Sequence, residues 1–330
     1  MKKKKHNYKR GNKKGEIMTD SGINMILLII GFVVIIILIG MIAYYTLIKE
    51  TGCHDSIVMR SSVNFGYFST ARVIPLQCTT EKKCLISDPK GSCSILGVAS
   101  KTNNILKENL DSNDHEKAKQ QVLEQLADSL YQCHTMLGEG QLLFEPPGVT
   151  DKNYCLICSR IVLDDKSRQE VPDITYSELY QYLSKKRTSD GKSYLESLHP
   201  QWTDWRSSML LFREMQDKST NQDFKNLKFE DWKIDISNPN GTAIIAQIAP
   251  AGYWKSLAAA GGAVVVLTGL ASVVGAPATI AMIAVGGSGI ATFWYTSPGG
   301  KFEYSPPEIY PYNPDVLQNL GCNSFETAPN

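Results

Sequence analysis

The sequence predicts an α+β fold stabilised by disulfide bonds, with an N-terminal transmembrane helix and a C-terminal Gly/Ala-rich hydrophobic helical hairpin. Three observations support this prediction. Residues 22–48 carry no charge, all eight cysteines follow that segment, and helix-like and strand-like patterns occur in separate stretches of the chain after it. We expect five regions: a basic cytoplasmic tail (1–21), a transmembrane anchor (22–48), a cysteine-rich α+β domain (49–252), a hydrophobic hairpin (253–297) and a Pro/Tyr-rich strap (298–330).

The N-terminal apolar segment predicts both an anchor and an orientation. At about 1.5 Å per residue, a helix over residues 25–48 crosses a hydrocarbon core of roughly 30 Å. Eight Lys and Arg residues lie between positions 2 and 14, whereas only Lys49 and Arg60 follow the segment closely. This asymmetry predicts a cytoplasmic N-terminus in a cell membrane, with the main domain outside. The net charge is +1, and no segment outside the basic tail has the cluster of Lys and Arg expected of a nucleic-acid-binding surface. We interpret the tail as a solvated segment that sets the membrane orientation.

A processed N-terminus is the alternative for this region. Gly15 follows two lysines and precedes an acidic residue and the hydrophobic helix, as in prepilin-type signals, and cleavage there would place Asp20 at the fifth mature position. Residues 16–23 are more polar than the start of a pilin. We therefore expect an uncleaved anchor.

The cysteines predict the compartment and the type of cross-link. An even number of cysteines on the oxidising side of a membrane indicates four disulfide bonds, although their spacing does not give the connectivity. The candidates are Cys53, Cys78, Cys84, Cys93, Cys133, Cys155, Cys158 and Cys322.

Residues 113–137 give the clearest helical pattern after the anchor. The apolar positions at helical spacing are Val122, Leu126, Leu130, Cys133 and Leu137. One of three residues (Ser112, Asn113 or Asp114) is expected to cap the helix, and Gly138 to end it. Cys133 lies on the apolar stripe, so we expect it to reach a strand beneath the helix.

Other stretches predict shorter elements. Strands are expected at residues 154–163 and 242–248, with two or three short strands within residues 56–76. Helices are expected at residues 175–186 and 193–198. The mixture predicts strands and helices that segregate in the α+β manner.

A second apolar block predicts a hairpin. Residues 256–300 contain no charge, and a Gly-Ala-Pro break at 275–277 separates two arms, 257–274 and 278–295, each long enough to span a bilayer. Aromatic residues mark both outer ends, and small residues recur along each arm. Three interpretations remain open: a transmembrane hairpin, a hairpin buried in protein, and an element that penetrates a target bilayer.

The strap and one surface turn carry further expectations. Five prolines between residues 298 and 314 predict an extended segment rather than a helix, and place Cys322 where it can tie the strap to the domain. Asn240 begins an Asn-Gly-Thr sequon after a proline and is a candidate glycosylation site.

Cys155 and Cys158 form a CxxC motif, the spacing of thiol–disulfide exchange enzymes. Those enzymes place the first cysteine at a helix N-terminus, which lowers its pKa. Here the motif lies in a strand-like run, where residues three apart point to opposite faces. We expect each cysteine to pair with a different partner.

The other candidate sites are weak. His54 adjoins Cys53 and His134 adjoins Cys133, but the strong sequence signal of a structural zinc site is two CxxC-like pairs at suitable spacing, and only one exists here. We therefore expect no metal and no cofactor, with these histidines on the surface or in ordinary hydrogen bonds. The acidic residues Glu139, Asp164 and Asp165 are interpreted as turn residues. Common catalytic motifs are missing from the sequence, so we expect no enzyme.

Four short segments of the chain resemble segments found in a group of uncharacterised proteins. They are KKGEIMTDSG before the anchor, CHDSIV at Cys53, CHTMLGEG at Cys133 and YCLICSRI at Cys155. In these segments the chain resembles cysteine-rich, membrane-anchored proteins of small-genome archaea. The resemblance implies a prokaryotic surface protein of unknown activity and supplies no catalytic residues.

These observations together predict a membrane-anchored envelope protein with a binding or structural role. Its expected partners are the lipid bilayer and another envelope protein, and no nucleic acid. Two alternatives stay open: a membrane-remodelling or pore-forming protein that uses the Gly/Ala hairpin, and an extracytoplasmic thiol–disulfide oxidoreductase acting through Cys155 and Cys158.

Overall fold

The computed structural model divides the chain into two units, Met1–Glu50 and Thr51–Asn330. The residues it describes are 27–36, 38–39, 55–58, 64–65, 68–69, 78–96, 105–111, 113–140, 153–200, 202, 204–206, 209–210, 213, 217, 228–250, 263–267, 280–285, 290–296, 302–320 and 322–326.

In the first unit, residues 27–36 and 38–39 are helical. Their apolar side chains are exposed, from 48% for Val33 and Leu38 to 73% for Leu28. No helix within the described ranges reaches the length and apolarity needed to cross a bilayer. Because the expected span of 25–48 extends beyond those ranges, the transmembrane helix stays a prediction.

The second unit is built around a mixed sheet to which nine described strands belong. Their order is β4-β3-β5-β8-β12-β11-β10-β9, and β13 also pairs with β5. The strands are β3 (Glu81–Ile86), β4 (Ile105–Asn109), β5 (Asn153–Leu163), β8 (Thr242–Pro250), β9 (Ala263–Leu267), β10 (Ile280–Val285), β11 (Ile290–Thr296), β12 (Phe302–Pro311) and β13 (Cys322–Glu326). Strands β3, β4, β5 and β13 run parallel to one another, whereas each neighbouring pair from β5 through β8 to β9 is antiparallel.

Helices and smaller elements complete the unit. The helices are α2 (His115–Met136), α3 (Asp165–Glu170), α4 (Tyr176–Lys185), α5 (Tyr194–Leu198) and α9 (Pro314–Asn319). Single 3₁₀ turns are η2 (Ser94–Leu96), η3 (Gly138–Gly140) and η4 (Phe229–Asp231). Two small antiparallel pairs join β1 (Asn64–Phe65) to β2 (Phe68–Ser69), and β6 (Ile174–Thr175) to β7 (Lys233–Ile234).

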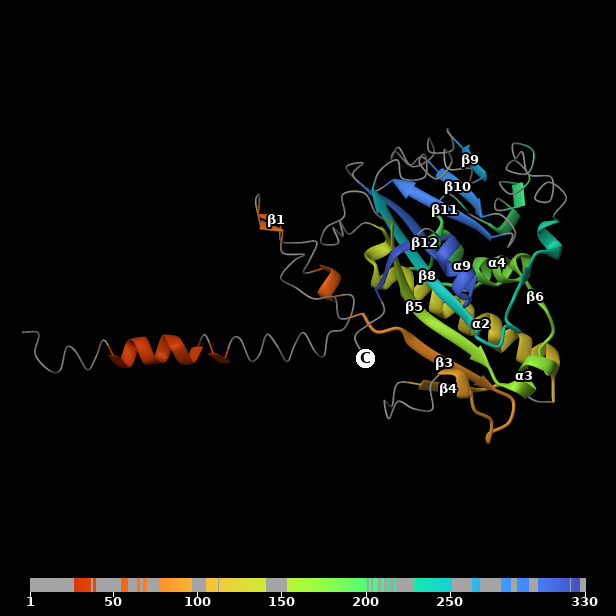
Figure 1. Ribbon diagram of the computed structural model, residues 1–330, viewed down its shortest axis with the longest axis horizontal. Helices are drawn as coiled ribbons and strands as arrows, with labels where there is room; N and C mark the ends of the chain where they lie inside the picture. Colours follow the sequence, from red (N-terminus) through yellow and green to blue (C-terminus); the bar gives the residue numbers. More distant parts are fainter. Residues whose placement is uncertain are drawn as a thin grey trace, which may run out of the picture. The chain divides into compact units, whose positions relative to one another are not determined.

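Helix α2 lies across one face of the sheet over β5, β8 and β12 (Figure 1). Its predicted apolar stripe is confirmed, because Val122, Leu126 and Leu130 are buried in the main core with α4 and α5. Of the three candidate caps, Asp114 is the one used, and its carboxylate accepts a hydrogen bond from the Lys117 amide at 3.0 Å. Gly138 follows with a φ of 65°, a conformation that glycine adopts without strain.

A second, smaller core lies on the opposite face of the sheet. Strand β5 alternates, so Cys155 and Ile157 join this core whereas Cys158 and Ile161 join the main one. A register shift in the pairing with β8 falls between Ile157 and Ser159. Helix α9 covers the second core through Val316 and Leu317, which pack against it.

The predicted strands at 154–163 and 242–248 and the predicted helices at 175–186 and 193–198 are confirmed as β5, β8, α4 and α5. The two short strands β1 and β2 fall within residues 56–76, as expected. Each helix begins with a side-chain cap, and Thr175 and Glu178 form a complete capping box at α4.

The prediction of a helical hairpin at residues 256–300 is wrong for the described parts of this range. Both arms contain strands, since β9 falls in the first arm and β10 and β11 in the second. Runs of Val and Ile favour strands as well as apolar helices, and the antiparallel β9–β10 and β10–β11 ladders satisfy main-chain groups that a single strand would leave unpaired. Strand β11 then joins β12, so this block continues the sheet. The break at 275–277 lies outside the described residues.

The strap is extended over β12, as predicted, but it contains the short helix α9. Pro314 is the first residue of α9, a position where the fixed φ of proline suits a helix and its missing N–H costs nothing. The strap therefore enters the sheet and then covers its second face.

The expected turn at the sequon is confirmed. The Gly241 amide donates to the Asn238 carbonyl at 2.8 Å, and Gly241 has a φ of 83°. A Cβ at this position would lie 2.5 Å from the Ile161 carbonyl oxygen. Asn240 is half-buried in this turn, and its glycosylation stays a prediction.

Candidate functional site

The described disulfide bonds span from 9 to 167 positions of the sequence. The described bonds are Cys84–Cys93, Cys133–Cys158 and Cys155–Cys322, with Cα–Cα distances of 5.8, 5.6 and 5.6 Å. Cys78 is disulfide-bonded as well, and Cys53 lies outside the described residues. Within the described part of the chain no cysteine is free.

The two cysteines of the CxxC motif bond to different partners, as the strand alternation predicts. Cys158 points into the main core and bonds to Cys133 of α2, whereas Cys155 points into the second core and bonds to Cys322 of β13. No Cys155–Cys158 bond exists that could be opened and closed in thiol exchange. The motif therefore fixes α2 to one face of the sheet and the strap to the other.

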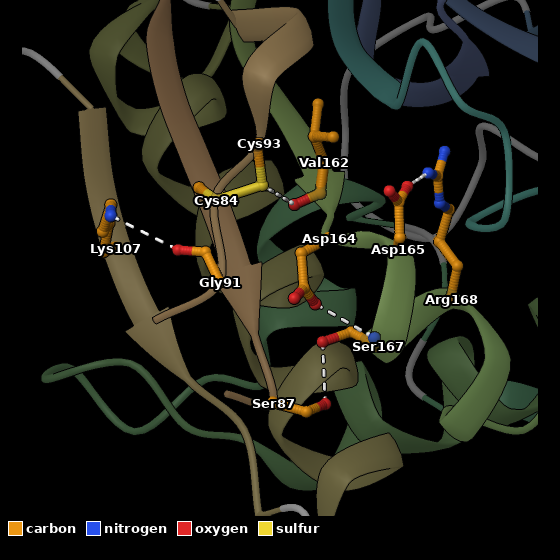
Figure 2. The surroundings of a disulfide bond; sticks show 10 residues. All are labelled: Cys84, Ser87, Gly91, Cys93, Lys107, Val162, Asp164, Asp165, Ser167 and Arg168. Atoms are coloured by element: carbon orange, nitrogen blue, oxygen red, sulfur yellow. Dashed lines mark hydrogen bonds and ion pairs between the residues drawn. A yellow bond between two sulfur atoms is a disulfide. The ribbon is translucent and has the colours of Figure 1, made fainter. Parts of the chain in front are cut away.

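The Cys84–Cys93 disulfide lies beside a polar cluster at the carboxyl ends of β3 and β5 (Figure 2). Asp164 caps α3 by accepting from the Ser167 amide at 3.0 Å, and the Ser167 and Ser87 hydroxyls lie 2.7 Å apart. The Cys93 sulfur lies 3.4 Å from the Val162 carbonyl oxygen. Gly91 passes so close to Asp164 that a Cβ would lie 2.5 Å from its Oδ2.

Carboxyl ends of parallel strands often bind ligands, but here the polar groups bind one another. The sequence predicts turn residues at Asp164 and Asp165, but they begin a helix: the first caps α3 and the second is its first residue, where it pairs with Arg168. Glu139 lies in a turn, at a φ of 56° within η3. The structure does not bring these three acids together into a catalytic set.

Two buried histidines meet between α2, α5 and β12. His134 Nδ1 lies 3.0 Å from the Tyr304 hydroxyl, and the His199 ring stacks on Trp202 with 4.0 Å between centroids. Both histidines are only 2% exposed. Burial lowers the pKa of His134 to about 4, against a smaller raising effect of the Ser197 main chain. Burial, with a contribution from His134, lowers the pKa of His199 to about 3.

This arrangement keeps two imidazoles neutral at physiological pH. Neutral imidazoles bind metals well, but no three His, Cys, Asp or Glu side chains in the described ranges come together as a metal site. The hydrogen bond to Tyr304 fits the expectation that His134 makes an ordinary hydrogen bond, although His134 is buried rather than on the surface.

A polar network occupies the second face of the sheet. Asn153 Nδ2 donates to Gln247 Oε1 at 2.9 Å and to the Leu320 carbonyl at 3.1 Å, and Gln247 Nε2 donates to the Tyr310 hydroxyl at 3.1 Å. Glu308, on β12, is 5% exposed, and its Oε1 has no hydrogen-bond partner among the described residues. Burial raises the pKa of this carboxyl well above its usual value.

We expect Glu308→Gln to stabilise the domain at pH 7 to 8 and to change its stability little at pH 4. Because folding raises the pKa of this carboxyl, its burial costs little stability below the ordinary carboxyl pKa. The free energy of unfolding of the domain falls as the pH rises above that value. The amide removes that loss while keeping the shape. Urea unfolding midpoints of both proteins across this pH range measure the effect, and a lower midpoint for the variant at pH 7 would contradict it.

Sequence reasoning missed the buried residues His199, Tyr304 and Glu308. His199 is the residue that follows α5. Tyr304 and Glu308 lie in β12, and the prolines of this strand predicted an extended strap. Tyr304 lies between Glu303 and Ser305, and this short apolar–polar alternation was the available signal.

No protein-family model, curated protein or solved structure matches this chain.

Proposed function

We propose that the chain is a non-enzymatic protein of the cell envelope, whose disulfide-bonded α+β domain lies outside the membrane and binds another envelope component. The disulfide framework carries the proposal. Three described bonds connect α2, the sheet and the C-terminal strap, and Cys84, Cys133 and Cys155 are each 1% exposed. Bonds of this kind form and persist in oxidising compartments.

The apolar N-terminal helix supports the proposal. From Leu27 to Ile39 the described side chains are apolar apart from glycine and are largely exposed, an arrangement that is costly in water and favourable in lipid. The segment contains no charge from residue 22 to residue 48. In the proposal this helix is the membrane anchor.

The described polar clusters support a binding role over catalysis. The Ser87–Ser167–Asp164 group is used up in capping α3, and the histidine pair is enclosed by aromatic rings of the core. The His134 imidazole lies beside the Tyr304 hydroxyl, but these side chains are only 2% and 6% exposed, which keeps a substrate from reaching them. The surface of the domain is therefore its proposed working part.

Labelling in intact cells tests the orientation. After mild reduction, we expect a membrane-impermeant maleimide to label Cys93 and Cys322, the half-buried members of their pairs. In an Asn12→Cys variant, the added cysteine is expected to react only after lysis, because the basic tail stays in the cytoplasm. Labelling of position 12 but not of Cys322 in intact cells would reverse the topology.

Alkaline carbonate extraction of the full chain tests the anchor separately. We expect the protein to remain in the membrane pellet, since an apolar segment of this length is buried in the hydrocarbon core. Release into the supernatant would contradict the anchor even if the labelling pattern indicated an outside location.

A further inference from the structure

Strand β13 fills a short slot at the edge of β5. On one side, β8 pairs with β5 from Tyr154 to Ile161. On the other side, β3 pairs with residues 159–163, and β13 pairs with residues 153–156 in parallel register. Because a strand has two hydrogen-bonding edges, β3 and β13 share one of them, and removal of β13 would uncover the main chain at the start of β5.

The described contacts of β13 and of the preceding helix α9 are covalent, polar and apolar. The Cys155–Cys322 bond is the covalent one, and Asn153 Nδ2 donates to the Leu320 carbonyl at 3.1 Å. Val316 and Leu317 of α9 pack against the second core. The pairing itself runs from Cys322 opposite Asn153 to Glu326 opposite Leu156, through main-chain groups.

The segment before α9 is fixed to the domain independently. The Tyr312 amide donates to the Gly241 carbonyl at 2.9 Å, and the Arg160 guanidinium lies 4.0 Å from the centre of the Tyr312 ring. Arg160 is in turn held by two hydrogen bonds to the Asn240 carbonyl, at 2.9 and 2.7 Å. Tyr312 is therefore held on the domain by contacts that do not involve α9 or β13.

We propose that the slot at residues 153–156 accepts β13 of a second copy of this chain, so that two copies exchange their C-terminal segments. The second copy's segment makes the same main-chain hydrogen bonds, the same α9 contacts and the same Cys155–Cys322 bond. Exchange of an identical terminal element needs no new interface. The proposal does not depend on the membrane location.

Thiol–disulfide exchange controls the swap. A small-molecule thiolate attacks the sulfur of Cys322, the Cys155–Cys322 bond breaks, and Cys155 leaves as a thiolate. The Cys155 thiolate of the second copy then attacks Cys322 in the mixed disulfide and expels the small thiolate. No net oxidation or reduction occurs, because one disulfide is replaced by another.

The three described disulfides differ in access. Cys322 and Cys93 are half-buried, whereas Cys133 and Cys158 are 1% and 7% exposed. Only nine positions separate Cys84 from Cys93, so that bond closes again within the same copy. Exchange between copies is therefore confined to Cys155–Cys322 while the domain stays folded.

Mixing isotope-labelled and unlabelled full-length chain in detergent with a little reduced glutathione tests the swap. After alkylation and digestion, mass spectrometry counts disulfide-linked peptides that carry one label of each kind. We expect mixed Cys155–Cys322 peptides to exceed mixed Cys133–Cys158 peptides by more than about tenfold, because Cys322 is half-buried whereas Cys133 and Cys158 are only 1% and 7% exposed to the thiolate. Equal mixing at all bonds, which indicates unfolding, or no mixing at all would overturn the proposal.

A Cys322→Ser variant gives a second readout without disulfide exchange. Its β13 is held by non-covalent contacts alone, so we expect a dimer whose share rises with protein concentration in size-exclusion chromatography with light scattering. A Cys93→Ser variant, which loses the other accessible disulfide, is expected to stay monomeric. A Cys322→Ser protein that is monomeric at every concentration would overturn the swap.

Discussion

Lowering the pH from 7 to 5 is expected to remove about 4 kcal/mol of folding free energy through His134 and His199, about 2 kcal/mol from each. The folded-state pKa values are about 4 and about 3, whereas an unfolded histidine titrates near 6.5. Below pH 6.5 the unfolded chain binds more protons than the folded one. The stabilising contribution is therefore complete above pH 6.5 and is lost progressively as the pH falls toward the folded-state values.

Glu308 opposes this trend. Its raised pKa makes the folded state more favourable as the pH falls toward the ordinary carboxyl value, so it offsets part of the histidine loss in the same window. The histidine effect is best measured in a Glu308→Gln background, by urea unfolding at pH 7 and pH 5. There we expect the full loss, and His134→Gln or His199→Gln is expected to remove about half of it.

His115 supplies the matched control. It is exposed at the start of α2, so we expect His115→Gln to leave the pH dependence unchanged. Equal slopes for His115→Gln and His199→Gln would show that the buried pair does not control acid stability. The core around the pair would then have to accommodate a charged imidazole, which the burial of both side chains disfavours.

The sequence predicted the elements that depend on local patterns. The apolar stripe and cap of α2 define that helix, and alternation in β5 was enough to separate Cys155 from Cys158. Each of these inferences uses residues within a few turns or strand positions of one another. The same reasoning gave Cys133 a strand beneath α2, which the Cys133–Cys158 bond confirms.

Sequence reasoning was less successful where the outcome depends on distant pairing. Residues 256–300 satisfy the apolar requirement of a helix, but the pairing of β11 with β12 and of β12 with β8 draws the described parts of this block into the sheet. Burial of Glu308 likewise depends on the register of β12 against β8, where it lies opposite Ile245. A local sequence pattern does not predict that register, because residues 251–301 separate the two strands in the sequence.

Removing the Cys133–Cys158 bond by the double substitution to alanine is expected to lower the free energy of unfolding by about 3 to 4 kcal/mol, from the entropy of a loop of this size, with a further cost from lost packing. The bond joins α2 to β5 through the main core, 25 positions apart in the sequence. Both sulfurs are buried, so alanine also leaves unfilled space between the helix and the sheet.

The Cys84/Cys93 double alanine variant is the matched control for this prediction. Its loop spans nine positions, for which chain entropy gives about 2 to 3 kcal/mol, and Cys93 is half-buried, so less packing is lost. Guanidinium unfolding with the other disulfides intact measures both variants. We expect the Cys133/Cys158 variant to be the less stable of the two, because its bond closes the longer loop and joins the long helix to the central strand through the main core. A smaller loss than in the control would mean that the contacts of Val122, Leu126 and Leu130 hold α2 on the sheet without help from the disulfide.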